Sequence, residues 1–190
     1  MWCVMHVEDG EEKRTERFLE KFLEDEICDS CFHLTRFRRK KYGGKWQTVQ
    51  EELLPGYVFI ATDEPEKLHK ALKRTPEYRL LGSDDAHVSV LEGAEADFIK
   101  RIAESGKKSG EIALSKIRVL KDGRVEILSG PLCYMEDLVS KIDLHKRTAE
   151  IKTDFMGQKK RLYLGVEFED VVCDTGLYRP GNRDRRPVSE

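Results

Sequence analysis

Two groups of residues in this sequence have types and spacings that could support chemistry or binding. The first is the run Cys28-Asp29-Ser30-Cys31-Phe32-His33, in which two cysteines and a histidine have the spacing of metal ligands. No second cysteine pair or nearby histidine completes a site. The pair also lies near the end of a predicted helix, whereas a redox C-x-x-C motif requires a helix start. We therefore expect packed or surface thiols, and neither a metal ion nor a cofactor.

The second group is a basic and aromatic run on both sides of Gly43-Gly44. Basic residues with interleaved aromatic rings can follow a nucleic-acid backbone and stack on its bases. The alternative is a hairpin tip that its charges keep soluble. The candidate nucleic-acid-binding residues here are Arg38, Arg39, Lys40, Lys41 and Trp46.

The rest of the sequence argues against an enzyme and against a secreted or membrane protein. It has no Walker loop, dinucleotide glycine fingerprint or nucleophile elbow. Its 34 basic and 36 acidic residues give a net charge of −2, so a globally basic footprint is absent. Five cysteines, an odd number, fit reduced thiols in the cytoplasm, and no stretch is long enough for a membrane helix.

The elements that must position these residues begin with a buried strand. Pro55-Gly56 predicts a turn, and Tyr57-Val58-Phe59-Ile60 predicts a strand that is buried on both faces. A strand is expected over residues 2–7, and Asp9 is the expected cap of the helix that follows. Further expected elements are a hairpin over residues 32–51, helices near residues 65–72 and 98–102, and strands at 78–81 and 88–91. Their order predicts a mainly antiparallel sheet with helices packed on it.

The chain divides at a run with linker composition, Ser105-Gly106-Lys107-Lys108-Ser109-Gly110. Beyond it, five short strands with turn residues between them predict a small barrel without a helix. Those strands are expected at residues 117–120, 125–128, 138–142, 148–151 and 162–168. We expect domains at 1–105 and 116–170, a linker at 106–115, and a disordered tail at 171–190.

Several short segments, taken together, resemble a known family. They are Trp2-Cys3-Val4, Leu54-Pro55-Gly56-Tyr57-Val58, the run from Gly123 to Pro131, Val139, Ile142-Asp143 and Gly157. Their order and spacing, with the linker between the two blocks, resemble the NusG family of transcription elongation factors over about residues 1–170. The resemblance implies an α+β fold. An N-terminal NGN-type α/β sandwich with a mainly antiparallel sheet is linked to a small C-terminal SH3-like β-barrel, the KOW domain.

Within that family, the sequence is similar to the LoaP group of antiterminators. The basic and aromatic hairpin is one reason, and an altered barrel turn is the other. A typical family barrel has glycine where Asp137 stands here, and glycine permits a positive φ. This difference puts in doubt binding of the usual barrel partners, a ribosomal protein and the termination factor Rho.

The resemblance implies a function without bond making or breaking. Family NGN domains bind the clamp helices of bacterial RNA polymerase, which holds the clamp closed and reduces pausing and termination. The matching positions here are Trp2, Tyr57 and Phe59, which could instead be ordinary core residues. His69-Lys70-Ala71 matches a contact with the gate loop of the β subunit, and the alternative is plain helix surface.

For the barrel, the resemblance implies binding to protein or to an RNA hairpin. The candidate RNA-binding residues are Lys121, Arg124, Lys141, Lys146, Arg147, Lys159, Lys160 and Arg161. The alternative is a set of solvated turns. The expected protein is a monomeric antiterminator acting at specific long operons. A general housekeeping elongation factor and a freestanding RNA-binding module are the other two functions that the sequence leaves open.

Overall fold

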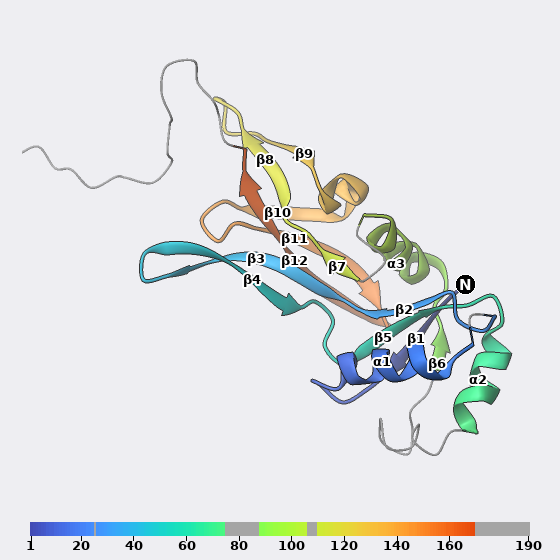
Figure 1. The fold of residues 1–190 in the computed structure, drawn as a ribbon. Coiled ribbons are helices and arrows are strands. Elements are labelled where there is room, and N and C mark those ends of the chain that lie inside the picture. The colour runs from blue at the N-terminus through green and yellow to red at the C-terminus, as the bar shows by residue number, and fades with distance from the viewer. Residues whose placement is uncertain (25, 75–87, 106–109, 170–190) are drawn as a thin grey trace, which may run out of the picture.

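The strand β5 lies inside a sheet that organises the N-terminal half of the computed structural model, which describes residues 1–24, 26–74, 88–105 and 110–169 (Figure 1). The sheet order is β2-β5-β1-β6, and every neighbouring pair in it is antiparallel. The strands are β1 (Trp2–His6), β2 (Ser30–His33), β5 (Tyr57–Ala61) and β6 (Val88–Val90). The predicted buried strand is therefore confirmed.

Alternation along β5 sends its side chains into two different cores. Val58 and Ile60 pack with residues of α1 (Glu12–Phe22) and α2 (Pro65–Lys73) on one face of the sheet. Phe59, on the other face, belongs to a second core, against which Tyr57 packs. That second core includes α3 (Gly93–Ser105).

The start of α1 differs from the prediction. Asp9 was expected to cap the helix, but Glu11 occupies the cap position and its side chain makes no capping hydrogen bond. The carboxylate of Glu12 accepts hydrogen bonds from the backbone N–H of Gly10 at 2.8 Å and of Gly56 at 2.7 Å. Gly56 has a φ of 79°, as its turn requires. Glu12 thus ties the start of α1 to the turn that precedes β5.

The predicted basic hairpin is present as β3 (Thr35–Tyr42) and β4 (Lys45–Glu52), joined at Gly43-Gly44. A short strand, β7 (Glu111–Ile112), pairs in parallel with β3. It falls inside the expected linker, of which residues 106–109 lie outside the described part. The expected strand at 78–81 and tail at 171–190 also lie outside it.

The C-terminal half contains a strand at each of the five predicted places. They are β8 (Ser115–Val119), β9 (Val125–Ser129), β10 (Val139–Asp143), β11 (Thr148–Phe155) and β12 (Gln158–Phe168). The sheet order is β10-β11-β12-β8-β9, with β12 and β8 parallel and the other pairs antiparallel. Two 3₁₀ turns that the strand pattern did not predict are η2 (Pro131–Tyr134) and η3 (Glu136–Leu138).

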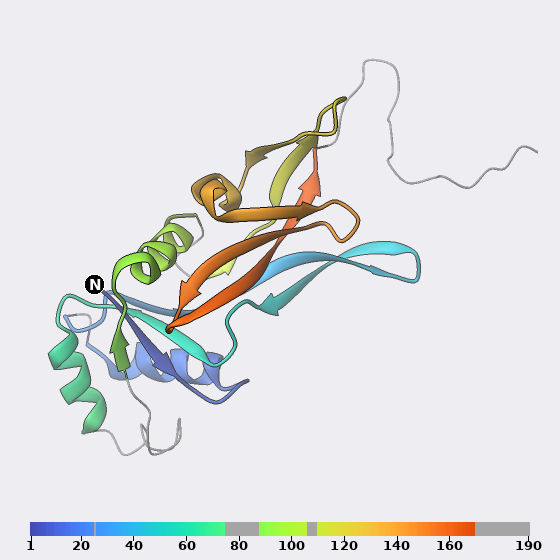
Figure 2. The ribbon, with the colours of Figure 1, turned by 180° about the vertical axis from the view of Figure 1, so that it is seen from behind.

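The two halves pack on one another and share a hydrophobic core. Figures 1 and 2 show α3 between the N-terminal sheet and the C-terminal strands. Phe59, Phe98 and Phe155, from β5, α3 and β11, belong to the same buried cluster. The backbones also approach closely, because a β-carbon at Gly165 of β12 would collide with the carbonyl oxygen of Phe37 in β3. The mixed α+β fold is thus a single packed unit in this structure.

We predict that Glu12→Ala lowers the free energy of unfolding by about 2–4 kcal/mol. The backbone N–H groups of Gly10 and Gly56 would lose their hydrogen-bond acceptor, and water could not easily replace it because Glu12 is only 2% exposed. Urea unfolding measures this value. Glu11→Ala is the matched control. It removes only the partly exposed pair with Arg14 and is expected to change stability by less than about 0.5 kcal/mol. Equal effects of the two substitutions would contradict this role for Glu12.

Candidate functional site: an aromatic sheet face and a basic hairpin

Trp2, Tyr57 and Phe59 lie on the same face of the N-terminal sheet. The register pairs Trp2 with Ala61 and His6 with Tyr57, so alternate residues of β1 and β5 point to one side. Trp2 and Tyr57 are half-buried. The ring centres of Trp2 and Phe32 are 5.5 Å apart in an edge-on contact, and those of Tyr57 and His6 are 5.3 Å apart. The structure thus brings the three residues together as one aromatic face.

The C-terminal half covers this aromatic face. The ring of Phe155 meets Tyr57 edge-on at 5.0 Å and lies 5.9 Å from the ring of Phe59. Phe59 and Phe155 have no exposed surface. In the docked arrangement, therefore, Phe59 is a core residue, as the alternative interpretation held, and another protein could reach it only if the barrel moved away.

Polar contacts surround the aromatic face where the two halves meet. Nη1 of Arg101 in α3 lies 2.6 Å from Oδ1 of Asp137 in η3, an ion pair that is largely exposed. Arg36 of the hairpin donates to the carbonyl oxygen of Tyr163 at 2.7 Å. The backbone N–H of Gly157 lies 3.4 Å from Oε1 of Glu95. Asp137, singled out in the sequence for its turn, therefore contacts the N-terminal half.

One face of the basic hairpin gathers three cations around a single carboxylate. Arg36, Arg38 and Lys40 all form ion pairs with Glu51. The hydrogen bond from Lys40 is the main reason that the pKa of Glu51 is lowered, and Arg38 and Arg36 add to the effect. This face keeps an excess of positive charge, as phosphate binding requires.

The opposite face of the hairpin contacts the barrel. The guanidinium of Arg147, in the turn between β10 and β11, lies 4.3 Å from the ring centre of Trp46. Arg39 and Lys41 alternate with the cations on the other face, and Lys41 is exposed. The structure therefore brings together predicted nucleic-acid residues from both halves, a juxtaposition that spacing along the chain could not reveal.

The predicted barrel cations lie in three separate places. Lys121 and Arg124 flank the β8–β9 turn, where Arg124 pairs with Asp122. Lys141, Lys146 and Arg147 belong to β10 and the turn after it, on the side of the β3–β4 hairpin (Figure 1). The third group is at the start of β12.

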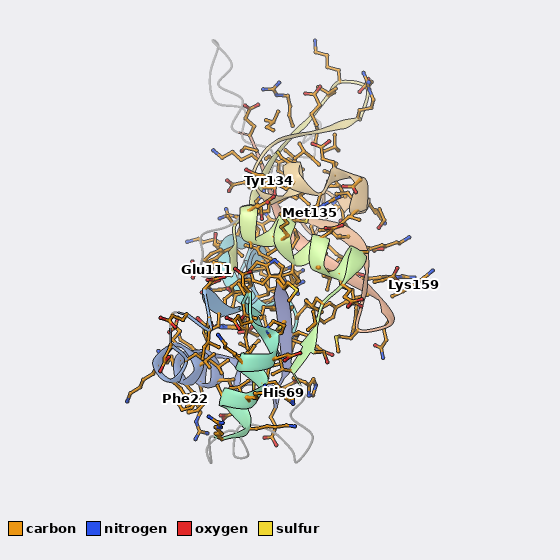
Figure 3. The ribbon with its side chains drawn as sticks, turned by 90° about the vertical axis from the view of Figure 1, so that its right-hand side faces the viewer. Phe22, His69, Glu111, Tyr134, Met135 and Lys159 are labelled. Atoms are coloured by element: carbon orange, nitrogen blue, oxygen red, sulfur yellow. The ribbon has the colours of Figure 1, made fainter. Side chains whose placement is uncertain are left out.

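The cluster at the start of β12 is divided by strand alternation. Lys159 and Arg161 are exposed, whereas Lys160 is half-buried and shares a face with the buried Leu162. Figure 3 shows Lys159 pointing away from the body of the protein. Lys152 lies directly opposite Arg161 on β11 and is exposed, so it extends this group. Sequence reasoning missed Lys152 because the strand pairing was unknown.

His69, Lys70 and Ala71 lie on α2. His69, labelled on α2 in Figure 3, and Lys70 line a mostly apolar pocket with Cys3 and with Val88 of β6. Ala71 is half-buried and packs against the core under α1 and α2.

The thiol of Cys31 donates a hydrogen bond to the backbone carbonyl oxygen of Glu16 at 3.6 Å. The neighbouring thiol of Cys31 lowers the pKa of Cys28, while the thiol of Cys28 and then burial raise the pKa of Cys31. Both are free thiols.

Within residues 1–24, 26–74, 88–105 and 110–169, no group of three or more His, Cys, Asp or Glu side chains is placed to hold a metal ion. In the same ranges, no helix combines the length and the apolar character that spanning a membrane requires.

His33 lies between carboxylates on two elements. Its Nδ1 contacts Glu16 of α1, and its Nε2 lies 3.6 Å from Glu52 at the end of β4. The bond to Glu16 raises the pKa of His33, with Glu52 and Glu12 adding to the effect and burial opposing it. Burial raises the pKa of Glu52. This cluster connects α1 to the base of the hairpin.

Comparison with known proteins places these features in a family. The family model described as "NusG: Transcription termination factor nusG" matches residues 1–100. The transcription termination/antitermination protein NusG of Thermus thermophilus is 25% identical over 183 residues, which cover 90% of this chain and 97% of that protein. A solved structure titled "Domain interaction in Thermotoga maritima NusG" is 18% identical, covering 86% of this chain and 92% of that one, with a TM-score of 0.44.

We predict that His33 makes stability depend on pH. Its pKa is raised in the folded protein above 6.5, so protonation favours the folded state. The stabilisation is complete below about pH 6.5 and is lost as the pH rises through the folded-state pKa. Burial raises the pKa of Glu52 as well, so protonation of Glu52 also favours the folded state.

The measurement is urea unfolding between pH 6 and pH 9 for the natural protein and His33→Gln. The stability difference between them is expected to shrink as the pH rises. His145→Gln, at an exposed turn position, is the control and is expected to show no such trend. A difference that stays constant across this range would contradict the role given to His33.

Proposed function

Because this chain belongs to the NusG family of transcription factors, we propose that it is an elongation and antitermination factor that binds RNA polymerase through its N-terminal NGN domain. The observation that carries the proposal is the family match over residues 1–100, the half that contains the aromatic sheet face. The name of the Thermus thermophilus relative, which covers both halves, supports action on termination.

The proposed polymerase-binding residues are Trp2, Tyr57 and Phe59. Protein interfaces depend on a few aromatic residues held rigidly near their centre, and a sheet face of three such residues supplies them. The target is the clamp helices. The pocket beside His69 and Lys70 supports a second contact of α2 with the gate loop, since it is lined mostly by apolar atoms.

The docked barrel competes with polymerase for the aromatic face. Phe155 packs on Tyr57 and Phe59, so the barrel has to leave before the clamp helices can bind. If about 1% of molecules are undocked, the apparent dissociation constant is about a hundredfold weaker than the intrinsic one. Docking would therefore limit binding until the polymerase itself displaces the barrel.

Once bound, the protein acts by shifting populations of polymerase states. Preferential binding to the closed clamp by about 1–3 kcal/mol shifts the equilibrium about 5- to 150-fold. That range is sufficient to suppress pausing and to allow read-through of terminators. No covalent step is involved.

We further propose that the KOW barrel and the hairpin contact nucleic acid, and that this restricts the protein to specific long operons, as in the LoaP group. Exposed cations in the barrel turns, and the excess charge around Glu51, support this proposal. A general elongation factor would act equally on every template. A freestanding RNA-binding module would bind RNA without polymerase.

Breaking the ion pair between α3 and η3 tests the competition. Arg101→Asp or Asp137→Arg is expected to raise the affinity of the whole protein for RNA polymerase about two- to fivefold, the range for an exposed ion pair. The double variant Arg101→Asp/Asp137→Arg restores the pair and is expected to return the affinity to its original value. Binding is measured by interferometry on immobilised polymerase. If the double variant instead showed both single-variant increases in affinity combined, the result would contradict the proposed competition between barrel and polymerase.

Single-round transcription through an intrinsic terminator tests the targeted function. We expect read-through on particular leader sequences, and its loss when Lys159 and Arg161 are changed to Glu. Lys21→Glu, on the exposed side of α1, is the charge-matched control. Equal read-through on all leaders would favour the general factor. No read-through and no polymerase binding would favour the RNA-binding module.

A further inference from the structure

Arg147 occupies a position between the two halves of the protein. Its guanidinium lies 4.3 Å from the ring centre of Trp46 in the hairpin and 5.1 Å from that of Phe168 at the end of β12. Two aromatic rings from different halves thus hold one cation in a fixed place. The contact with Trp46 exists only while the barrel is docked.

A second guanidinium lies on the same face of the hairpin. Arg39 donates a hydrogen bond to Oγ1 of Thr48 at 2.8 Å. Thr48 and Trp46 are two residues apart on β4, so their side chains point to one side with backbones about 7 Å apart. Arg39 and Arg147 are therefore held side by side, one from each half of the protein.

These two cations lack a counter-ion. Within the residues that the structure describes, neither Arg39 nor Arg147 has a carboxylate oxygen within 4 Å, and Nε of Arg39 is buried without a partner. Burial and the neighbouring Arg39 lower the pKa of Arg147, and Glu167 only partly opposes this. Bringing two guanidinium groups together therefore opposes docking unless an anion accompanies them.

The backbone at Arg147 is also unusual. Its φ is 53°, in the left-handed region that glycine and asparagine occupy more readily. Arginine in this position therefore costs some backbone conformational energy. The result is that this side chain, and no other from the turn, stacks on Trp46.

We propose that Arg39 and Arg147 together form a binding site for a phosphate group between the hairpin and the barrel, and that the bound phosphate stabilises the docked arrangement. Guanidinium groups donate paired hydrogen bonds to phosphate oxygens, and two of them match the charge of a phosphate monoester. Trp46, Phe168 and Thr48 position the donors. Because the site is complete only when docked, phosphate binding and docking favour one another. The proposal does not depend on polymerase binding.

The source of the phosphate is either a small anion, such as a nucleoside triphosphate, or the backbone of a nucleic acid. Trp46 provides a direct probe. The chain has two tryptophans, so Trp2→Phe leaves Trp46 as the sole indole emitter. Its fluorescence is recorded during titration with sodium phosphate, a nucleoside triphosphate and a short single-stranded RNA, at constant ionic strength.

We expect a saturable change in fluorescence with at least one probe. Arg39→Gln and Arg147→Gln should each weaken binding about tenfold or more, because each removes charge-assisted hydrogen bonds. Arg14→Gln, on the exposed side of α1, is the control and should leave binding unchanged. Saturation by free phosphate or triphosphate identifies a small-anion ligand, and saturation by RNA alone identifies a backbone phosphate.

The link to docking is tested in Arg101→Asp, in which docking is weakened. The saturating probe is expected to reduce oxidation of Phe155 by hydroxyl radicals, and Arg147→Gln is expected to remove this protection. The proposal is overturned if no probe saturates, if both glutamine variants bind as well as the natural residues, or if the probe leaves Phe155 oxidation unchanged.

Discussion

The packing of Phe155 against Tyr57 and Phe59 is the contact on which the arrangement of the two halves depends. It follows from alternation along β5, which supplies one core under α1 and α2 and leaves aromatic rings on the other face. A large apolar face on a sheet requires a partner. In this structure the barrel is that partner, and RNA polymerase is the partner that we propose for the active protein.

Docking also determines where the positive charge of the protein is available. Arg147 is fixed on Trp46, and Arg36 donates to the backbone of β12, so part of the basic hairpin is engaged by the barrel. Lys159 and Arg161 stay exposed in the docked arrangement. The same side chains can therefore hold the halves together or contact nucleic acid, and release of the barrel exposes aromatic and basic surfaces at once.

Local patterns predicted most of the helices and strands, since each of these leaves a signal in neighbouring residues, but they did not predict β7 or the two 3₁₀ turns. Pro55-Gly56 marked the turn before β5, Gly43-Gly44 marked the hairpin, and five apolar runs marked the barrel strands. The long-range contacts leave no such signal. The bond from Gly56 to Glu12, the pair of Asp137 with Arg101 and the stacking of Arg147 on Trp46 join residues that are far apart in sequence. The sequence predicted Trp2, Tyr57 and Phe59 as one group, but it did not predict that Phe155 of the barrel packs over this face.

Hydroxyl-radical footprinting of the whole protein, alone and bound to RNA polymerase, tests the central claim most directly. Oxidation of the Tyr57 and Phe155 side chains is read by mass spectrometry. The account predicts that Phe155 is protected in the free protein and that polymerase exposes it, while oxidation of the half-buried Tyr57 does not increase, because the clamp helices replace the barrel. Continued protection of Phe155 in the complex, or increased oxidation of Tyr57, would contradict it.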